Sequence, residues 1–201
     1  MALELEYKLQ LPSVDCLNEI LVCPEITGLL ESPFREIPMK TTYYDSDDNT
    51  FSRLHWTLRH RMEGEESVVC LKTPGSVARS RNEWQVLAPA LTEESIQALI
   101  REGAPEKLMD YYRNAPPRPS CGAAFLRKCA MVTFSDGSRA EIAADQGEVF
   151  GAKGTHPILE LELELHGGSP AEMTRLATLL CKTYSLKEQP YSKFARARSL
   201  R

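Results

Sequence analysis

The sequence predicts an α+β protein in which about eight antiparallel strands close into a barrel, with helices packed outside it. Three observations lead to this fold class. Several segments alternate between apolar and charged residues, which is the period of a β-strand with two unlike faces, and residues 159–165 do so strictly. Strands and helices do not alternate along the chain, which argues against a parallel sheet. A closed sheet with its apolar faces outward, beneath the helices, would place the charged faces inside.

In the first half of the chain, strands are predicted where β-branched, aromatic or alternating residues stand between turn signals. Ser13 suits the N-cap of a helix that ends before Pro24. Thr92 suits the N-cap of another helix, which Gly103 would end. The predicted strands cover 2–10, 40–45, 56–62, 67–73 and 79–87. The helix after Ser13 is predicted over 14–22, and one further short helix over 105–113.

The second half opens on a proline-rich segment, 115–119, which would act as a stiff connector. Asp136-Gly137 is a signal for a hairpin turn between two strands. Ser169 and Pro170 are typical of the N-cap and the first position of a helix. The predicted strands cover 125–134, 138–144 and 157–165, the last helix runs over 170–184, and the segment 192–196 is basic.

The composition excludes several classes of protein. The chain has 201 residues, of which 42% are hydrophobic and 26% charged, and this suits one globular domain. A net charge of −4 argues against binding to nucleic acid. No run of about 18 apolar residues predicts a membrane span, and no signal peptide is visible. The six cysteines form no CxxC pair and the histidines no zinc-ligand spacing, so we expect reduced thiols in the cytoplasm.

Charged side chains gather on the predicted inner faces of the strands. Glu160, Glu162 and Glu164 share one face and repel one another, so a cation is expected to face them. Carboxylates without clustered histidine or cysteine favour Mg²⁺ or Mn²⁺, and converging arginines and lysines suit a compact phosphate-like anion. Together they indicate phosphoryl transfer. The acids are Glu4, Glu6, Glu83, Glu141, Asp145, Glu160, Glu162 and Glu164, and the bases are Lys8, Arg59, Arg61, Lys72, Arg81, Arg127, Lys193 and Arg196.

The order of these motifs along the chain resembles one protein family. Glu4-x-Glu6-x-Lys8 is similar to the ExExK signature of the CYTH superfamily, the triphosphate tunnel metalloenzymes. The later motifs follow the same order as in that family, and their residues look most like those of the bacterial inorganic triphosphatase branch. The resemblance implies an eight-stranded antiparallel barrel that forms a tunnel, in a single CYTH domain over 1–201. A helical CHAD domain often follows in that branch, and since this sequence stops at Arg201, we expect no CHAD domain here, either absent or removed. The further motifs are Tyr43-Tyr44-Asp45, Leu58-Arg59-x-Arg61, Leu71-Lys72-Thr73, Arg81-x-Glu83-Trp84, the segments 141–148 and 160–165, and Ser192-Lys193-Phe194-Ala195-Arg196.

The resemblance also implies roles for individual residues. Lys8 and Glu162 would be catalytic. One departure from the family pattern concerns Arg127-Lys128, where the family often spaces two bases by one residue, so only one can face inward and we favour Arg127. Glu164 is expected to be peripheral, and the role of Glu141 is open. Metal ligands would be Glu4, Glu6, Asp145, Glu160 and Glu162, holding two Mg²⁺ or Mn²⁺ ions, and substrate contacts would be Lys8, Arg59, Arg61, Lys72, Arg81, Arg127 and Lys193.

The function that the resemblance implies first is hydrolysis of inorganic triphosphate to diphosphate and phosphate. Thiamine triphosphatase, nucleoside triphosphatase and class IV adenylate cyclase activities use the same fold and stay open, as does a noncatalytic module that binds polyphosphate. The sequence has no distinct base-binding motif, which favours the small inorganic substrate. Neither nucleic acid nor a membrane is an expected partner, and a homodimer is left open.

Overall fold

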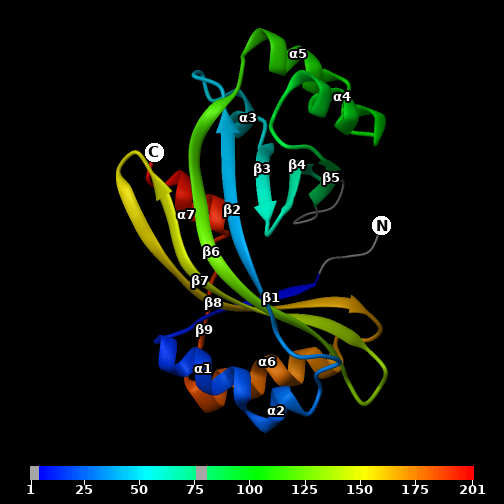
Figure 1. The fold of residues 1–201 in the computed structure, drawn as a ribbon, viewed down its shortest axis with the longest axis vertical. Helices are drawn as coiled ribbons and strands as arrows, with labels where there is room; N and C mark the ends of the chain where they lie inside the picture. The colour runs from blue at the N-terminus through cyan, green and yellow to red at the C-terminus, as the bar shows by residue number, and fades with distance from the viewer. Residues whose placement is uncertain (1–4, 76–80) are drawn as a thin grey trace. The chain divides into compact units, whose positions relative to one another are not determined.

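The computed structural model describes residues 5–75 and 81–201 (Figure 1). The predicted metal ligand Glu4, the first residues of the strand at 2–10 and the first two of the strand at 79–87 lie outside the described residues. The strands are β1 (Glu6–Gln10), β2 (Arg35–Asp45), β3 (Thr57–Glu63), β4 (Glu66–Pro74), β5 (Arg81–Leu87), β6 (Arg118–Thr133), β7 (Arg139–Gly151), β8 (Gly154–Gly167) and β9 (Lys187–Glu188). The helices are α1 (Val14–Val22), α2 (Pro24–Thr27), α3 (Thr50–Arg53), α4 (Glu93–Arg101), α5 (Lys107–Asn114), α6 (Ala171–Tyr184) and α7 (Lys193–Arg198). In the described part of the chain, no helix combines the length and apolar character that crossing a membrane requires.

The local signals at the helix starts operate largely as predicted. Helix α1 has the predicted bounds, because the Ser13 hydroxyl accepts a hydrogen bond from the Cys16 amide at 3.1 Å. Helix α6 begins one residue later than predicted. The Ser169 hydroxyl accepts a hydrogen bond from the Ala171 amide at 3.2 Å, and Pro170 is the residue before the first turn. The connector predicted at 115–119 is shorter, since β6 already begins within it.

The prediction of a closed eight-stranded barrel was wrong. Within the described residues, nine strands form one sheet in the order β5-β4-β3-β2-β6-β7-β8-β1-β9, and the two ends of this order do not pair with each other. The pairings of β1 with β8 and β9, and of β2 to β5 in succession, are antiparallel. Strand β9 pairs with the outer edge of β1, where Leu9 lies opposite Glu188. Two residues carry no periodicity, so the sequence pattern did not reveal this ninth strand.

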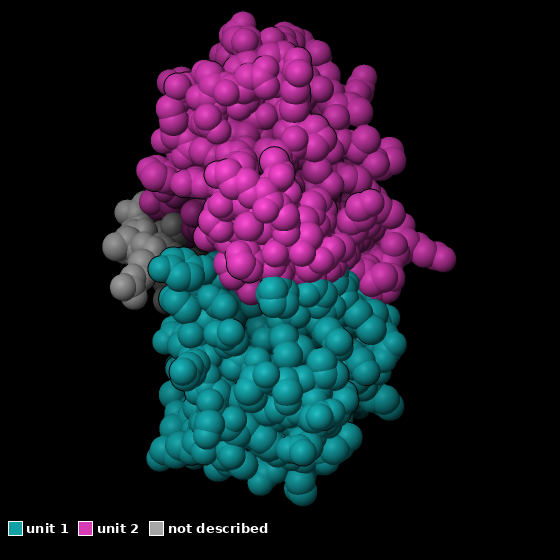
Figure 2. Space-filling view, turned by 90° about the vertical axis from the view of Figure 1, so that its left-hand side faces the viewer, with its two compact units in different colours: residues 1–37, 125–147, 157–192 teal, residues 38–124, 148–156, 193–201 magenta. Residues whose placement is uncertain are grey.

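The chain divides into two compact units (Figure 2). The longest strands, β2, β6, β7 and β8, have residues in both. We call the units the first and the second and describe each by itself. The first unit contains residues 1–37, 125–147 and 157–192, and the second contains 38–124, 148–156 and 193–201.

The core of the first unit lies between helices and strands. Helices α1, α2 and α6 pack against the strand segments of the same unit (Figure 1). Ile20 of α1, Met173 of α6 and Ile142 of β7 are completely buried there. Leu161 and Leu163 of β8 are also completely buried, which fixes the orientation of that strand.

The core of the second unit joins α3, α4 and α5 to strands β3 and β4. Its fully buried members include Phe51, Leu71 and Leu99. Helix α4 is held at its start by Thr92, whose hydroxyl accepts from the Ser95 amide while the Ser95 hydroxyl receives a hydrogen bond from the Thr92 amide. These helices cover one face of β3 and β4 and leave the other face for the charged residues of those strands.

Candidate functional site

Strand β8 carries two buried glutamates because its alternation gives the other face to the core. With Leu161 and Leu163 in the core, Glu160 and Glu162 point to the opposite face, where Asp145 of β7 joins them. These three residues, which we call the acidic cluster, are 1%, 9% and 0% exposed, respectively. One carboxylate oxygen from each lies within 4.8 Å of the others. All three belong to the first unit.

Arg127 of β6 supplies positive charge to the acidic cluster. Its Nε and Nη2 atoms donate to the two oxygens of Asp145 at 2.8 and 2.7 Å, and Nη2 also donates to Glu162 Oε2 at 2.6 Å. Burial disfavours the guanidinium charge, but the hydrogen bonds to Asp145 and the surrounding carboxylates outweigh it and raise the pKa of Arg127. The adjacent Lys128 instead pairs with Glu36, an exposed residue, at 3.1 Å.

Strand β1 places Lys8 beside the acidic cluster. In the register of β1 and β8, Lys8 lies opposite Glu162 and Glu6 lies opposite Glu164. The Lys8 Nζ atom is 3.5 Å from Glu162 Oε1 and 3.4 Å from Glu6 Oε2. The Glu6 side chain is 39% exposed, and among the described residues it does not belong to the acidic cluster. Of the described residues predicted as metal ligands, Glu6 therefore stands apart.

The acidic cluster has the donor chemistry of a site for a hard divalent ion. Mg²⁺ and Mn²⁺ prefer carboxylate oxygens, and ligands on opposite sides of Mg²⁺ lie about 4.2 Å apart. The three oxygens of the cluster, within 4.8 Å of one another, fit this span after a small movement. Since Arg127 bonds both oxygens of Asp145, an ion at this carboxylate would share it with the guanidinium or displace it.

Strands β3 and β4 of the second unit bring three cations together. Arg59 and Arg61 alternate onto one face of β3, and Lys72 follows on the neighbouring strand. Arg59 Nη2 lies 3.0 Å from Glu83 Oε1, and Lys72 Nζ lies 2.6 Å from Glu83 Oε2. Arg61 pairs with Glu63. We call Arg59, Arg61 and Lys72 the basic cluster.

The side chains of the basic cluster are largely buried, and their like charges repel one another. The Arg59, Arg61 and Lys72 side chains are 14%, 23% and 25% exposed. The Nε atoms of Arg59 and Arg61 are buried and have no hydrogen-bond partner within the described residues. Burial and the like charge of Arg59 together lower the pKa of Arg61. An anion bound here would satisfy these donors and relieve the repulsion.

Cys70 and Glu83 accompany the basic cluster. The Cys70 thiol donates to Glu83 Oε1 at 2.9 Å. Burial raises the pKa of Cys70 to about 11, and Glu83 adds to the rise while Arg59 opposes it. Burial would also raise the pKa of Glu83, but Lys72, the thiol hydrogen bond and Arg59 outweigh it and lower this pKa. The thiol is therefore protonated near neutral pH and the carboxylate is charged.

Two other predicted substrate contacts lie in the second unit. Arg81 donates to the backbone oxygen of His55 at 2.9 Å. Lys193 is the first residue of α7, and the next residue, Phe194, lies with its ring 4.8 Å from the ring of Tyr43. The structure thus assigns Lys8, Arg127 and the acidic cluster to the first unit, and the basic cluster, Arg81 and Lys193 to the second.

The contact of Cys70 with Glu83 was not predicted, because the cysteines were expected only to be reduced thiols. Cys70 precedes Lys72 by two residues, so strand alternation alone put both on one face. Glu83 was placed among the inner acids but given no partner, and its pairing with Arg59 and Lys72 depends on the register of β4 with β5.

Comparison with known proteins identifies the family. The sequence model of the CYTH domain matches residues 2–197. An inorganic triphosphatase from Haemophilus influenzae is 30% identical over 136 residues, which are 66% of this chain and 37% of that protein. The chain therefore spans little more than a third of the length of this curated relative.

Solved structures resemble the fold. A putative adenylyl cyclase from Hippeastrum, described as having a dominant triphosphatase activity, superposes with a TM-score of 0.60 at 17% identity, covering 98% of this chain and 96% of that one. A putative adenylate cyclase from Bacillus halodurans gives a TM-score of 0.54 at 18% identity over 94% of both chains. Since the family model extends over nearly the whole sequence, the protein belongs to the CYTH domain family.

Proposed function

We propose that this protein hydrolyses inorganic triphosphate to diphosphate and phosphate with the help of Mg²⁺ or Mn²⁺. The observation that carries the proposal is the pair of buried arginines, Arg59 and Arg61, whose Nε donors have no partner within the described residues. Such donors suit a compact, highly charged anion. The similarity to the inorganic triphosphatase of Haemophilus influenzae supports this substrate over larger ones.

The acidic cluster is the proposed metal site. Asp145, Glu160 and Glu162 would hold the ion, and a second ion would bind during catalysis. The bound metal would neutralise phosphate oxygens and lower the pKa of a water molecule that attacks phosphorus. Glu6 and Glu4, which the ExExK resemblance implicates, are proposed as additional ligands.

The roles of the remaining residues follow from their charge and surroundings. Arg59 and Arg61 would bind phosphoryl oxygens through paired N–H donors, and Lys72 would hold another oxygen as a point charge. Arg81, Arg127 and Lys193 are proposed as further contacts. Lys8, 3.5 Å from Glu162, would stabilise the negative charge that develops on the leaving diphosphate.

The location of the protein is also a proposal. All six cysteines are free thiols, and free thiols are typical of a reducing compartment. This supports the cytoplasm.

A substrate panel tests the function. Purified protein is incubated with inorganic triphosphate, ATP or thiamine triphosphate, each with Mg²⁺ and with Mn²⁺, and phosphate, diphosphate and cyclic AMP are measured. We expect phosphate and diphosphate from triphosphate at the highest kcat/KM. Cyclic AMP from ATP would instead show a cyclase, and preference for thiamine triphosphate would show the thiamine enzyme. Tight triphosphate binding without phosphate release at saturating metal would leave only a binding module.

Two variants test the proposed residues. Glu162→Gln should abolish turnover at all Mg²⁺ concentrations, because it removes a metal ligand, whereas Glu164→Gln, on the same face of β8, should change it little. Arg59→Ala should mainly raise KM, because substrate binding would lose the roughly 1.5–3 kcal/mol that a charge-assisted hydrogen bond contributes. Arg53→Ala is its control, since Arg53 pairs with Asp48 at an exposed position. Unchanged kinetics for Glu162→Gln would exclude the metal site.

A further inference from the structure

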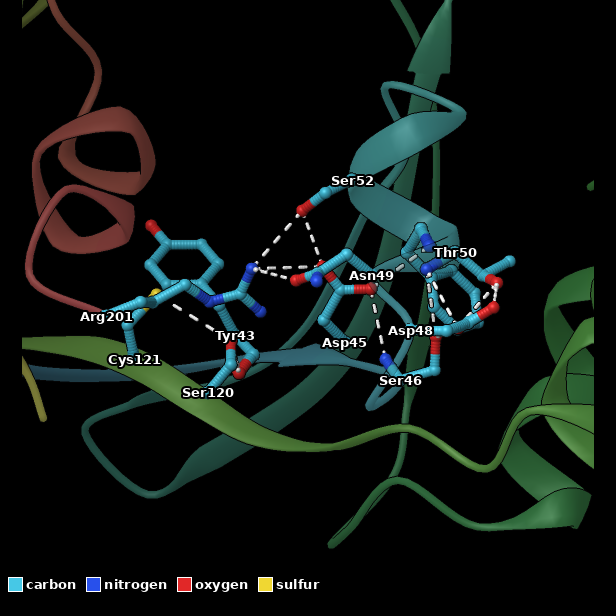
Figure 3. A network of polar contacts seen from close by, with 11 residues as sticks. Tyr43, Asp45, Ser46, Asp48, Asn49, Thr50, Ser52, Ser120, Cys121 and Arg201 are labelled. Carbon is cyan, nitrogen blue, oxygen red and sulfur yellow. Dashed lines mark hydrogen bonds and ion pairs between the residues drawn. The ribbon is translucent and has the colours of Figure 1, made fainter.

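Asp45 at the end of β2 is a buried carboxylate for which the proposed function has no use. It is 5% exposed and belongs to the Tyr43-Tyr44-Asp45 motif. Figure 3 shows the polar network around it. Its Oδ1 atom accepts from the Ser46 and Phe51 amides at 3.0 Å each, and its Oδ2 atom accepts from the Ser52 hydroxyl.

Arg201 completes this network from beyond the end of α7. Its Nη1 atom donates to Asp45 Oδ2 at 3.1 Å and to Asn49 Oδ1 at 3.3 Å (Figure 3). The Asp45 side chain is 3% exposed and that of Arg201 is 22% exposed, so the ion pair is mostly shielded from solvent. A buried carboxylate is stable only when it is paired, and here Arg201 supplies a charged partner.

Close backbone packing brings Arg201 to this position. A Cβ atom at Gly151 would lie 2.5 Å from the carbonyl oxygen of Leu200, so only glycine permits this approach. The same carbonyl accepts a hydrogen bond from the Lys153 amide at 2.8 Å. Ala197, on α7 itself, is completely buried. The end of α7 and the residues that follow it are therefore fixed against the end of β7 and the turn after it.

Tyr43 of the same motif fixes the other end of α7. Its ring lies 4.8 Å from that of Phe194, and in the register of β2 and β3 it lies opposite Arg59. Burial raises the pKa of Tyr43, while the charges of Arg59, Lys193 and Arg61 oppose the rise, as cations near one phenol would. Lys193, which precedes Phe194, is thereby brought near the basic cluster.

From this geometry we infer that Asp45 and Arg201 are positioning residues, which hold α7 so that Lys193 stands beside the basic cluster and binds the same anion. The inference rests on the proposed triphosphate substrate. A lysine on a free segment would lose side-chain and backbone freedom on binding, whereas a lysine on an anchored helix has lost most of it beforehand. The motif thus contributes to substrate affinity without touching the substrate.

Arg201 is the better residue to change. Asp45 also accepts hydrogen bonds from Ser46 and from Phe51 and Ser52 of α3, so that its loss would threaten folding itself. Arg201→Gln, Arg201→Lys, Lys193→Gln and the double variant Lys193→Gln/Arg201→Gln are compared in the full chain. Arg198→Gln is the control, since Arg198 is an exposed arginine of the same helix. KM and kcat for triphosphate with Mg²⁺ are measured, together with the melting temperature.

We expect Arg201→Gln to raise KM about fivefold with kcat nearly unchanged. An effect of this size is typical of the coupling between residues in one contact network, here Arg201 and Lys193. Arg201→Lys, which keeps the positive charge, should have a KM close to that of the unaltered protein. Arg198→Gln should leave KM unchanged. With Lys193 already replaced, Arg201→Gln should add almost nothing. An equal rise in KM with and without Lys193, or no rise at all, would overturn the inference.

The failure of the proposed function is distinguishable from the failure of this inference. If the unaltered protein hydrolyses no triphosphate, the same variants are compared by calorimetric titration with triphosphate. A weaker affinity for Arg201→Gln that depends on Lys193 would then support the positioning role although the enzyme proposal fails. Absence of triphosphate binding by the unaltered protein would overturn both.

Discussion

Replacing Arg127 by methionine should destabilise the protein strongly. The substitution removes three charge-assisted hydrogen bonds, of 2.8, 2.7 and 2.6 Å, from Asp145 and Glu162. Asp145 is completely buried, so its carboxylate would lose its nearest cation in a place that water does not reach. Removing one partner of a buried ion pair typically costs about 3–5 kcal/mol. We therefore expect the free energy of unfolding to fall by about this amount.

The matched control is the adjacent residue. Lys128→Met breaks only the pair with the exposed Glu36, and such surface pairs contribute about 0–1 kcal/mol. Urea unfolding followed by far-ultraviolet circular dichroism measures both variants under the same conditions. Mg²⁺ should stabilise Arg127→Met more than the unaltered protein, because the metal would replace the missing charge. A loss below about 1 kcal/mol for Arg127→Met, equal to that of Lys128→Met, would refute the reasoning.

Three further predictions concern the second unit. The pKa of Glu83 is lowered, so its ionised carboxylate stabilises the fold fully at pH values above its ordinary pKa of 4.5, and this stabilisation is lost as the pH falls through the lowered pKa. Glu83→Gln should therefore make the free energy of unfolding, measured by urea titration, less dependent on pH on the acid side. An unchanged pH dependence would contradict this. Cys70, with its pKa raised to about 11, should resist iodoacetamide near neutral pH until the chain unfolds, which peptide mass spectrometry detects; equally fast labelling of the folded protein would disagree. Gly122→Ala would bring a Cβ within 2.4 Å of the Phe150 ring and should destabilise by about 1–3 kcal/mol in thermal unfolding. Gly167→Ala meets nothing within 4 Å and should be nearly silent; equal losses would argue against the contact.

Strand and helix positions were predictable where side-chain period and caps agree. The alternation in 159–165 predicted β8, and burial of Leu161 and Leu163 follows from the same pattern. Ser13 and Thr92 located the starts of α1 and α4 because a side-chain cap is a local interaction. The antiparallel α+β class followed from these elements, and the family followed from the order of the motifs.

The closure of the sheet was not predictable in this way. Whether the last strand meets the first depends on which edges are already paired, and β9 pairs with β1 through only two residues. The grouping of Asp145 with Glu160 and Glu162 depends on how β7 is aligned with β8. The pairing of Glu83 with Lys72 depends in the same way on the register of β4 with β5. Sequence spacing gives the face of a residue within its strand but not its neighbour on the next strand.

Strand β9 has a consequence for solubility. The free edge of a strand offers unpaired N–H and C=O groups to any other chain, and β1 would offer such an edge without β9. Lys187 and Glu188 pair with Gln10 and Leu9, and both are exposed. Two charged residues therefore occupy the edge at which a strand of another chain could pair. Loss of this cover should favour edge-to-edge aggregation before it alters the acidic cluster. Two residues thus cover the Leu9–Gln10 end of the strand that carries Lys8.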